Sequence, residues 1–307
     1  MSAQAATAAP ATAKGVEEAV RFSAEGKDLF GILHLPAGRT KYRSILLMVV
    51  GGPQNRTGSH RSFTVLARGF AAQGIPVFRF DYVGLGDSEG DWRGFTYAGP
   101  SLKAAIDFLH AEFPGLENVV LWSLCDGSAA CALYAPSDKR IGGMILSNPY
   151  VHSAQGQAKA FLKHYYLKRL TDPDFWKKVF SFRFNPLKAA SSMGDVAKAA
   201  SGGGTAKPIA GMTIGPGEDP PELPKKVMEG LQAYKGPLRL ILSTDDLTAQ
   251  EFLGLFRGSL KSKGPRGEGD VRYVEGADHT FTQGAWKERV AALSAEAWGA
   301  LRTGKAA

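Results

Sequence analysis

Long apolar runs are absent from this chain of 307 residues. No segment approaches the roughly 18 consecutive apolar residues that a membrane-spanning helix requires. The first residues are rich in alanine and threonine and lack the apolar core of a secretory signal, so we interpret residues 1–16 as a disordered leader. These absences predict a cytoplasmic protein without a transmembrane segment, and they leave peripheral contact with a membrane open.

Cysteine is also scarce, since Cys125 and Cys131 are the two in the chain. Six residues turn a helix by about 600°, so two side chains at this spacing on one turn and helix point apart, and we expect no disulfide between them. Two free thiols without a secretory signal fit a reducing compartment. We expect neither a metal ion nor another cofactor.

Acidic residues are outnumbered: 29 Asp and Glu stand against 37 Lys and Arg, which gives a net charge of +8 and a pI of about 9.4. Much of the excess lies between residues 151 and 200, where nine basic residues accompany three acidic ones. No nucleic-acid-binding motif goes with this charge, so we expect no nucleic-acid partner. The excess is either a solvated basic face or a surface for an acidic substrate, an acyl carrier or a membrane.

Strand-like and helix-like segments alternate along the chain. Residues 45–50 form a continuous apolar run, which is typical of a strand buried on both faces. Such alternation predicts a parallel sheet with helices on both of its faces. The predicted strands are 20–24, 29–35, 45–50, 76–80, 119–122, 141–146, 238–242 and 271–274, and the predicted helices are 62–73, 102–113, 128–134, 249–260 and 286–301.

The alternation breaks after Pro149. Two further helices rich in aromatic and basic residues are predicted at 158–169 and 175–182, and the Gly- and Pro-rich segment 201–224 is a predicted loop. We therefore predict one α/β domain with an inserted cap and no internal repeat. Its core covers residues 17–149 and 235–307, and its helical cap covers residues 150–234.

A strand-to-helix turn carries the main chemical signal. The segment Ser-Leu-Cys-Asp-Gly joins a short apolar strand to a helix, and a nucleophile elbow requires this setting, with small residues on both sides of the nucleophile. Ser123 and Gly127 meet this requirement around Cys125. The helix N-terminus would stabilise a thiolate, and the N–H of Asp126 would be one oxyanion donor. The alternatives are a buried structural Cys125 or Ser123 as the nucleophile, and Cys131 is expected to pack in the core.

A cysteine nucleophile needs a base, and the base needs an acid that orients it. In a fold with such an elbow, the acid and then the base follow the nucleophile along the chain. Asp245 and Asp246 come directly after one late predicted strand, and His279 comes after the last one. We predict His279 as the base and Asp246 as the acid, with Asp245 as the alternative. The other carboxylate would cap the following helix.

The loop after the third predicted strand would supply the second oxyanion donor. It begins Gly-Gly-Pro-Gln, and its proline has no N–H to donate. We predict the N–H of Gln54, with Gly52 as the alternative; a plain flexible turn is the competing interpretation. His60 and Arg61 follow, and either face the pocket or lie on the surface. The glycine-rich segment 81–88 lacks GxGxxG spacing, so we interpret it as structural support for the elbow.

Further motifs complete the pattern: Gly51-Gly52-Pro53-Gln54, Phe80-Asp81-Tyr82, Leu124-Cys125-Asp126-Gly127, Asn148-Pro149, Leu162-Lys163-His164-Tyr165-Tyr166, Arg183-Phe184-Asn185-Pro186 and Asp246-Leu247-Thr248-Ala249. Together they resemble the type 1 hydrolases associated with the exosortase A system. The resemblance extends from about residue 21 to residue 301 and includes the predicted cap. It implies an α/β-hydrolase fold with a Cys–His–Asp triad, carried here by Cys125, His279 and Asp246.

These residues predict an enzyme that transfers the acyl group of an ester or thioester to Cys125. Release by water would make it a hydrolase acting on a small-molecule or carrier-bound substrate. Release to an amine, hydroxyl or thiol would make it an acyltransferase, because a thioester intermediate reacts well with amines and thiols. The basic, aromatic segment with Lys163, His164 and Tyr165 would suit an acidic acyl donor. A non-catalytic binding scaffold is the third interpretation.

Overall fold

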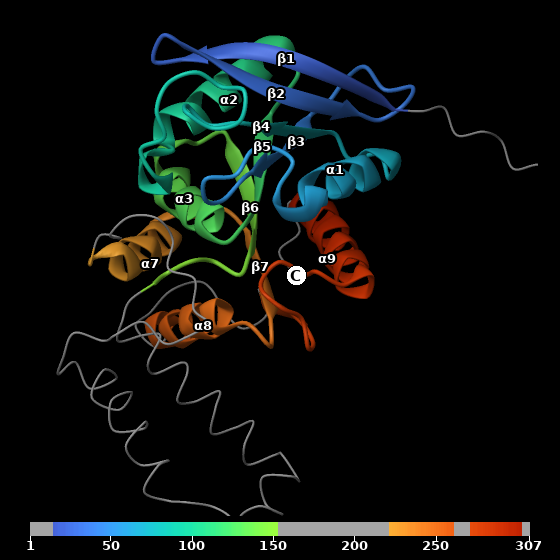
Figure 1. Ribbon diagram of the computed structural model, residues 1–307. Coiled ribbons are helices and arrows are strands. Elements are labelled where there is room, and N and C mark those ends of the chain that lie inside the picture. The colour runs from blue at the N-terminus through green and yellow to red at the C-terminus, as the bar shows by residue number, and fades with distance from the viewer. Residues whose placement is uncertain (1–14, 153–220, 261–270, 303–307) are drawn as a thin grey trace, which may run out of the picture.

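The computed structural model describes residues 15–152, 221–260 and 271–302. The predicted cap helices and most of the predicted loop 201–224 lie outside these residues. The described residues form an eight-stranded sheet in the order β1-β2-β4-β3-β5-β6-β7-β8 (Figure 1). Neighbouring strands from β4 to β8 are parallel, whereas β2 pairs antiparallel with both β1 and β4. The chain therefore has the mostly parallel sheet that the alternation predicts.

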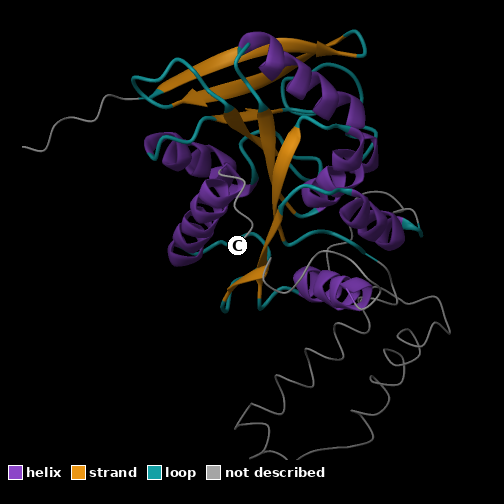
Figure 2. Cartoon of the chain, turned by 180° about the vertical axis from the view of Figure 1, so that it is seen from behind, coloured by secondary structure: helices purple, strands orange, loops and turns teal. Residues whose placement is uncertain are grey.

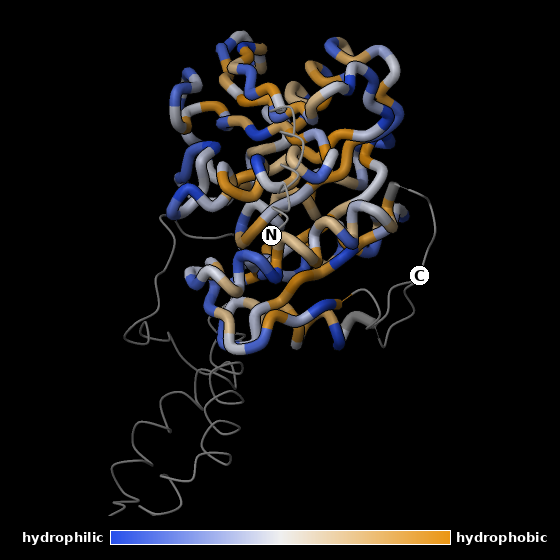
Figure 3. The backbone as a smooth tube through the Cα atoms, turned by 90° about the vertical axis from the view of Figure 1, so that its right-hand side faces the viewer, coloured by the Kyte–Doolittle hydropathy of each residue, from blue (hydrophilic) through white to orange (hydrophobic). Residues whose placement is uncertain are grey.

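The parallel strands are the apolar runs of the sequence. Every residue of β3 is buried, and β5 is buried except at its first residue, because helices cover both faces of the sheet here. The parallel strands are β3 (Ser44–Val49), β4 (Val77–Phe80), β5 (Asn118–Leu124), β6 (Ile141–Ser147), β7 (Leu238–Ser243) and β8 (Val271–Val274). Figure 3 shows these hydrophobic segments in the interior and hydrophilic segments along the outer turns.

The first two strands form a hairpin at one edge of the sheet. β1 (Val16–Ala24) pairs with β2 (Lys27–Leu35), and the register places Ala24 opposite Lys27. The two residues between the strands, Glu25 and Gly26, have φ values of 50° and 72°. Positive φ at both positions matches the right-handed twist of the strands in a tight hairpin.

Helices cover both faces of the sheet. α1 and α9 contact each other on one face, and α2, α3 and α7 cover the other face, with α8 beside α7 (Figures 1 and 2). No helix in the described part of the chain is long and apolar enough to cross a membrane. The helices are α1 (Ser62–Ala72), α2 (Gly99–Glu112), α3 (Asp126–Tyr134), α7 (Leu223–Ala233), α8 (Leu247–Leu260) and α9 (Gly284–Arg302), with short 3-10 helices at Ser59–Arg61, Phe95–Tyr97 and Ala135–Ser137.

Helix α7 is the element that the sequence analysis missed. It lies inside the segment interpreted as cap, yet it packs against α3 of the core: a Cβ added to Gly230 would lie 2.2 Å from the carbonyl oxygen of Ala132. Its buried residues Leu223, Val227 and Leu231 recur every four positions, which is helical spacing. The Gly- and Pro-rich composition just before the helix obscured this pattern.

The parallel strands bring the segments after β6, β7 and β8 together at their carboxyl ends. The N–H of Asn148 after β6 donates to Ile241 in β7 at 3.2 Å, and the N–H of Asp245 after β7 donates to Ala277 after β8 at 3.2 Å. Residues that are far apart in the sequence therefore share one edge of the sheet, which is where α/β sheets gather their functional groups.

Candidate active site

Cys125 occupies a strained turn between β5 and α3. Its φ of 62° and ψ of −132° are rare for a residue with a side chain and cost of the order of 1–3 kcal/mol. Hydrogen bonds over-determine this conformation: the N–H of Cys125 donates to Ser147 at 3.0 Å, and its carbonyl accepts from the N–H of Ser128 at 3.0 Å. The strained turn supports the predicted elbow, because it presents a side chain at the N-terminus of a helix.

Small residues allow the turn to approach β3. A Cβ on Gly127 would lie 2.5 Å from the carbonyl oxygen of Val50. Ser123 is fully buried, and its hydroxyl donates to the carbonyl of Val49 at 2.6 Å. Ser123 thus fastens β5 to β3 and is not accessible to a substrate. Cys131 lies fully buried in the core, where burial raises the pKa of its thiol.

Asp246 and His279 form an ion pair. The Nδ1 of His279 lies 2.7 Å from the Oδ2 of Asp246, whose side chain is buried. Asp246 also accepts the N–H groups of Thr248 and Ala249 at 3.1 Å each, so it caps α8. From the sequence, the pairing and the capping were expected to fall on different carboxylates. Asp246 makes both contacts, and Asp245 is exposed.

The Cys125 thiol and the His279 imidazole lie close enough that each shifts the pKa of the other. Burial raises the pKa of the thiol, and the imidazole opposes that shift without cancelling it. Burial lowers the pKa of His279, but its bonds with Asp246 and Cys125 outweigh burial and raise this pKa well above its ordinary value. His279 thus lies between Asp246 and Cys125, and these two neighbours stabilise its imidazolium form beside the sulfur.

A buried pair that the sequence analysis did not single out holds the loops of this site together. The side chain of Asn148 donates to the hydroxyl of Ser243 at 2.8 Å and to the carbonyl of His279 at 2.9 Å. The hydroxyl of Ser243 in turn donates to the carbonyl of Asp278 at 2.8 Å. Asn148 has a φ of 40°, a conformation in which asparagine is enriched. In the sequence it stood out only as part of the Asn148-Pro149 motif.

The loop after β3 meets the elbow through Asp126. The N–H of Gly52 donates to the Oδ2 of Asp126 at 2.6 Å, so this predicted alternative donor is already occupied by a carboxylate. The preferred donor, Gln54, lies on the exposed part of the same loop. Its N–H therefore stays a prediction.

A buried carboxylate fastens the far end of that loop. Asp81 is fully buried and accepts hydrogen bonds from the backbone and the guanidinium of Arg56. The guanidinium of Arg56 also pairs with Asp87 at 2.5 Å. These bonds join the loop after β3 to the glycine-rich segment 81–88, in agreement with a structural role for that segment.

The remaining predicted site residues do not join this cluster. His60 and Arg61 lie in the 3-10 helix before α1, both with positive φ, and both are exposed. Lys163, His164 and Tyr165 lie outside the described residues. Among the residues that the structure describes, no group of three His, Cys, Asp or Glu side chains is arranged to hold a metal ion.

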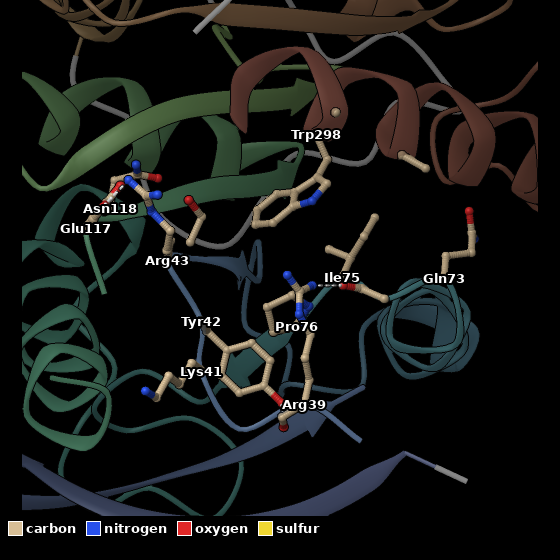
Figure 4. A pocket seen from close by; sticks show the side chains of 14 residues that line it. Arg39, Lys41, Tyr42, Arg43, Gln73, Ile75, Pro76, Glu117, Asn118 and Trp298 are labelled. Carbon is tan, nitrogen blue, oxygen red and sulfur yellow. Dashed lines mark hydrogen bonds and ion pairs between the residues drawn. The ribbon is translucent and has the colours of Figure 1, made fainter. Parts of the chain in front are cut away.

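A cavity of about 830 Å³ opens at the other end of the sheet, where β3, β4 and β5 begin (Figure 4). Its lining is basic, but Arg39 donates to the carbonyl of Gly74 at 3.2 Å, and Arg43 pairs with Glu117 at 2.5 Å. Two of the basic side chains in the lining, Arg39 and Arg43, therefore already have partners within the protein. Cys125 follows the carboxyl end of β5, so this cavity is remote from the cluster of Cys125, His279 and Asp246.

Comparison with known proteins agrees with this architecture. The family model of serine aminopeptidase, S33, matches residues 52–192. An esterase of Pyrococcus furiosus has a similar structure, with a TM-score of 0.59, 17% identity and coverage of 92% of this chain and 90% of the esterase. Proline iminopeptidase of Mycobacterium smegmatis gives a TM-score of 0.57 at 15% identity, covering 92% of this chain and 98% of that one.

Dienelactone hydrolase of Anabaena variabilis gives a TM-score of 0.56 at 15% identity, with coverage of 92% of this chain and 97% of the other. No curated protein matches the sequence. At these identities the likeness shows the fold alone. The α/β-hydrolase fold predicted from the sequence is therefore confirmed.

Proposed function

We propose that this chain is a hydrolase that cleaves an ester or thioester through a covalent acyl intermediate on Cys125. The observation that carries the proposal is the convergence of three parts of the chain: a thiol on a strained turn lies beside an imidazole, which is paired with a buried carboxylate. A nucleophile, a base and an orienting acid in hydrogen-bonded sequence are the arrangement that acyl transfer requires.

In the first half of the reaction, His279 takes the proton of Cys125, and the sulfur attacks the carbonyl carbon. The carbonyl π pair moves onto oxygen, where the backbone N–H of Asp126 at the start of α3 would stabilise the charge. The tetrahedral intermediate collapses, the bond to the leaving oxygen or sulfur breaks, and His279 returns the proton to the leaving group. Asp246 stabilises the imidazolium between these transfers.

In the second half, His279 removes a proton from water, and the hydroxide attacks the thioester carbonyl. The carboxylic acid leaves, and Cys125 recovers its proton. An esterase and a dienelactone hydrolase have a similar fold, and carbonyl substrates of this kind are compatible with it. The resemblance to exosortase A-associated hydrolases is in keeping with the same triad.

Acyl transfer is the second candidate, and the cysteine itself favours it. A thioester reacts readily with amines and thiols, so an acceptor bound in place of water would take the acyl group. The basic residues Lys163 and His164 would suit an acidic donor for either reaction. Reversing the charge of Lys163 and its basic neighbours should then weaken the binding of an anionic donor, and unchanged affinity would remove this part of the proposal.

Product analysis separates the two candidates. The protein is incubated with a p-nitrophenyl ester in the presence and absence of an amine and a thiol acceptor, and the acid and the acylated acceptor are quantified. A hydrolase releases the acid in both cases, whereas an acyltransferase diverts most of the acyl group to the acceptor. If the wild type releases p-nitrophenol only at the uncatalysed rate and no adduct forms on Cys125, both enzyme activities are excluded. The non-catalytic binding scaffold is then the remaining interpretation.

A further inference from the structure

The carboxylate of Asp126 lies where the proposed reaction needs an empty anion site. Its Oδ2 accepts the N–H of Gly52 at 2.6 Å, and its Oδ1 accepts the N–H of Gly127 at 3.0 Å. These donors belong to the two segments that flank Cys125, namely the loop after β3 and the first turn of α3. Backbone N–H groups from the same two segments would have to hold the oxyanion of an acyl-transfer intermediate.

The backbone at Gly51 lies so close to the Asp126 carboxylate that a side chain at position 51 would not fit between them. A Cβ on Gly51 would lie 2.1 Å from the Oδ1 of Asp126 and 2.8 Å from the carbonyl oxygen of Leu124. Glycine at position 51 therefore lets the loop close over the side chain. The contact is a built feature of the site, because the loop approaches α3 only where no side chain intervenes.

The charge of Asp126 opposes the chemistry of its neighbour. Burial raises the pKa of this carboxyl group to about 6, against the opposing effect of the N–H donors of Gly52 and Gly127. The carboxylate also contributes to the raised pKa of Cys125. An anion at this place therefore disfavours both a thiolate on Cys125 and a second negative charge on a substrate oxygen.

We propose that the ionised Asp126 side chain occupies the anion site of the resting enzyme, and that Gly52 donates to a substrate oxyanion only after Asp126 is protonated or turns away. This inference rests on the proposed function, and it makes Gly52 the second oxyanion donor in place of Gln54. The titratable groups that interact with this carboxylate are Cys125, His279 and Tyr82. Tyr82 is buried with its pKa raised well above the ordinary value, so it stays neutral, and Asp126 is the group that changes charge near neutral pH.

The test compares wild type with Asp126→Asn and Asp126→Ala in the hydrolysis of a neutral p-nitrophenyl ester between pH 5 and pH 8.5. Both variants should exceed wild type in kcat/KM by about tenfold at pH 8, where Asp126 is ionised, and by much less at pH 5. Glu112→Gln removes an exposed carboxylate on α2 and should leave the ratio near one at every pH. Slower turnover in both variants at all pH values, with Ala slower than Asn, would overturn the proposal and indicate a simple tether for the loop.

A second measurement needs no turnover. The rate of Cys125 alkylation by iodoacetamide, followed by mass against pH, reports the thiolate directly, and Cys125→Ala provides the blank. Asp126→Asn should move the midpoint down by about one pH unit. If the midpoint shifts but neither wild type nor any variant hydrolyses the ester, the proposed function and the role of Gly52 are overturned. The effect of Asp126 on the pKa of Cys125 would still stand. An unshifted midpoint together with a flat activity ratio would overturn the inference alone.

Discussion

Asn148 and Ser243 exchange two hydrogen bonds across neighbouring strands. The side-chain amide of Asn148 donates to the hydroxyl of Ser243 at 2.8 Å, and the N–H of Ser243 donates back to the Oδ1 of Asn148 at 2.8 Å. Both residues are fully buried. Because Asn148 also holds the carbonyl of His279, this pair fixes the loop that carries the base against the loop that carries Asp246.

Replacing Asn148 by glycine should lower kcat by at least about tenfold with little change in KM, because the amide acts on the placement of His279 and not on the substrate. Glycine keeps the positive φ of 40° without strain, so the effect reports the lost side chain. Asn148→Ala, which also adds backbone strain, should be less stable than Asn148→Gly. Steady-state kinetics and urea denaturation measure the two effects. A higher KM at constant kcat would argue against a positioning role.

Asp246→Asn should reduce kcat/KM by about 10²–10⁴, because a neutral amide no longer stabilises the imidazolium of His279. Asp245→Asn is the matched control, since Asp245 is the adjacent carboxylate and is exposed. It should stay within about twofold of wild type. Equal losses in the two variants, measured with the same ester, would contradict the assignment of Asp246.

Gly127→Ala should destabilise the fold by about 1–3 kcal/mol, because its Cβ would lie 2.5 Å from the carbonyl oxygen of Val50 and the elbow would have to move. Gly115→Ala is the control, since a Cβ there meets no atom within 4 Å. Urea denaturation of both variants measures the difference in free energy of unfolding. Similar stability of the two variants would mean that the close approach of the elbow to β3 is wrong.

Asp126→Asn should also change the pH dependence of stability. The folded-state pKa of Asp126 is raised to about 6, above its unfolded value of about 3.9. The stabilisation of the fold by this carboxyl group is therefore complete below pH 4 and is lost as the pH rises through 6. The asparagine variant should therefore gain about 1–3 kcal/mol relative to wild type between pH 4 and pH 8. Thermal unfolding at several pH values measures this gain, and parallel curves for the two proteins would refute it.

The sequence predicted those parts of the site that follow from local rules. A strand running directly into a helix, with small residues around Cys125, specifies a strained turn from a few neighbouring positions. Asp246 and His279 were predicted to interact because each follows a strand that ends at the same edge of the sheet, and their side chains are in contact in the structure. The alternation of apolar runs and helices was enough to predict the sheet.

Contacts between distant segments could not be predicted in this way. Asn148 and Ser243 are 95 positions apart, and both look like ordinary loop residues until the strands are placed side by side. The sequence allowed Gly52 as an oxyanion donor, but the occupation of its N–H by Asp126 depends on how the loop closes over α3. The double role of Asp246, which pairs with His279 and caps α8, was missed because each role was expected of a separate carboxylate.

The most direct test of the central claim is the intact mass of the protein after brief exposure to a p-nitrophenyl ester, followed by acid quenching and peptide mapping. The account predicts one added acyl group on the peptide that contains Cys125, slower formation of this adduct in His279→Ala, and no adduct in Cys125→Ala. An acyl group that persists in Cys125→Ala, or that maps to another residue, would contradict it.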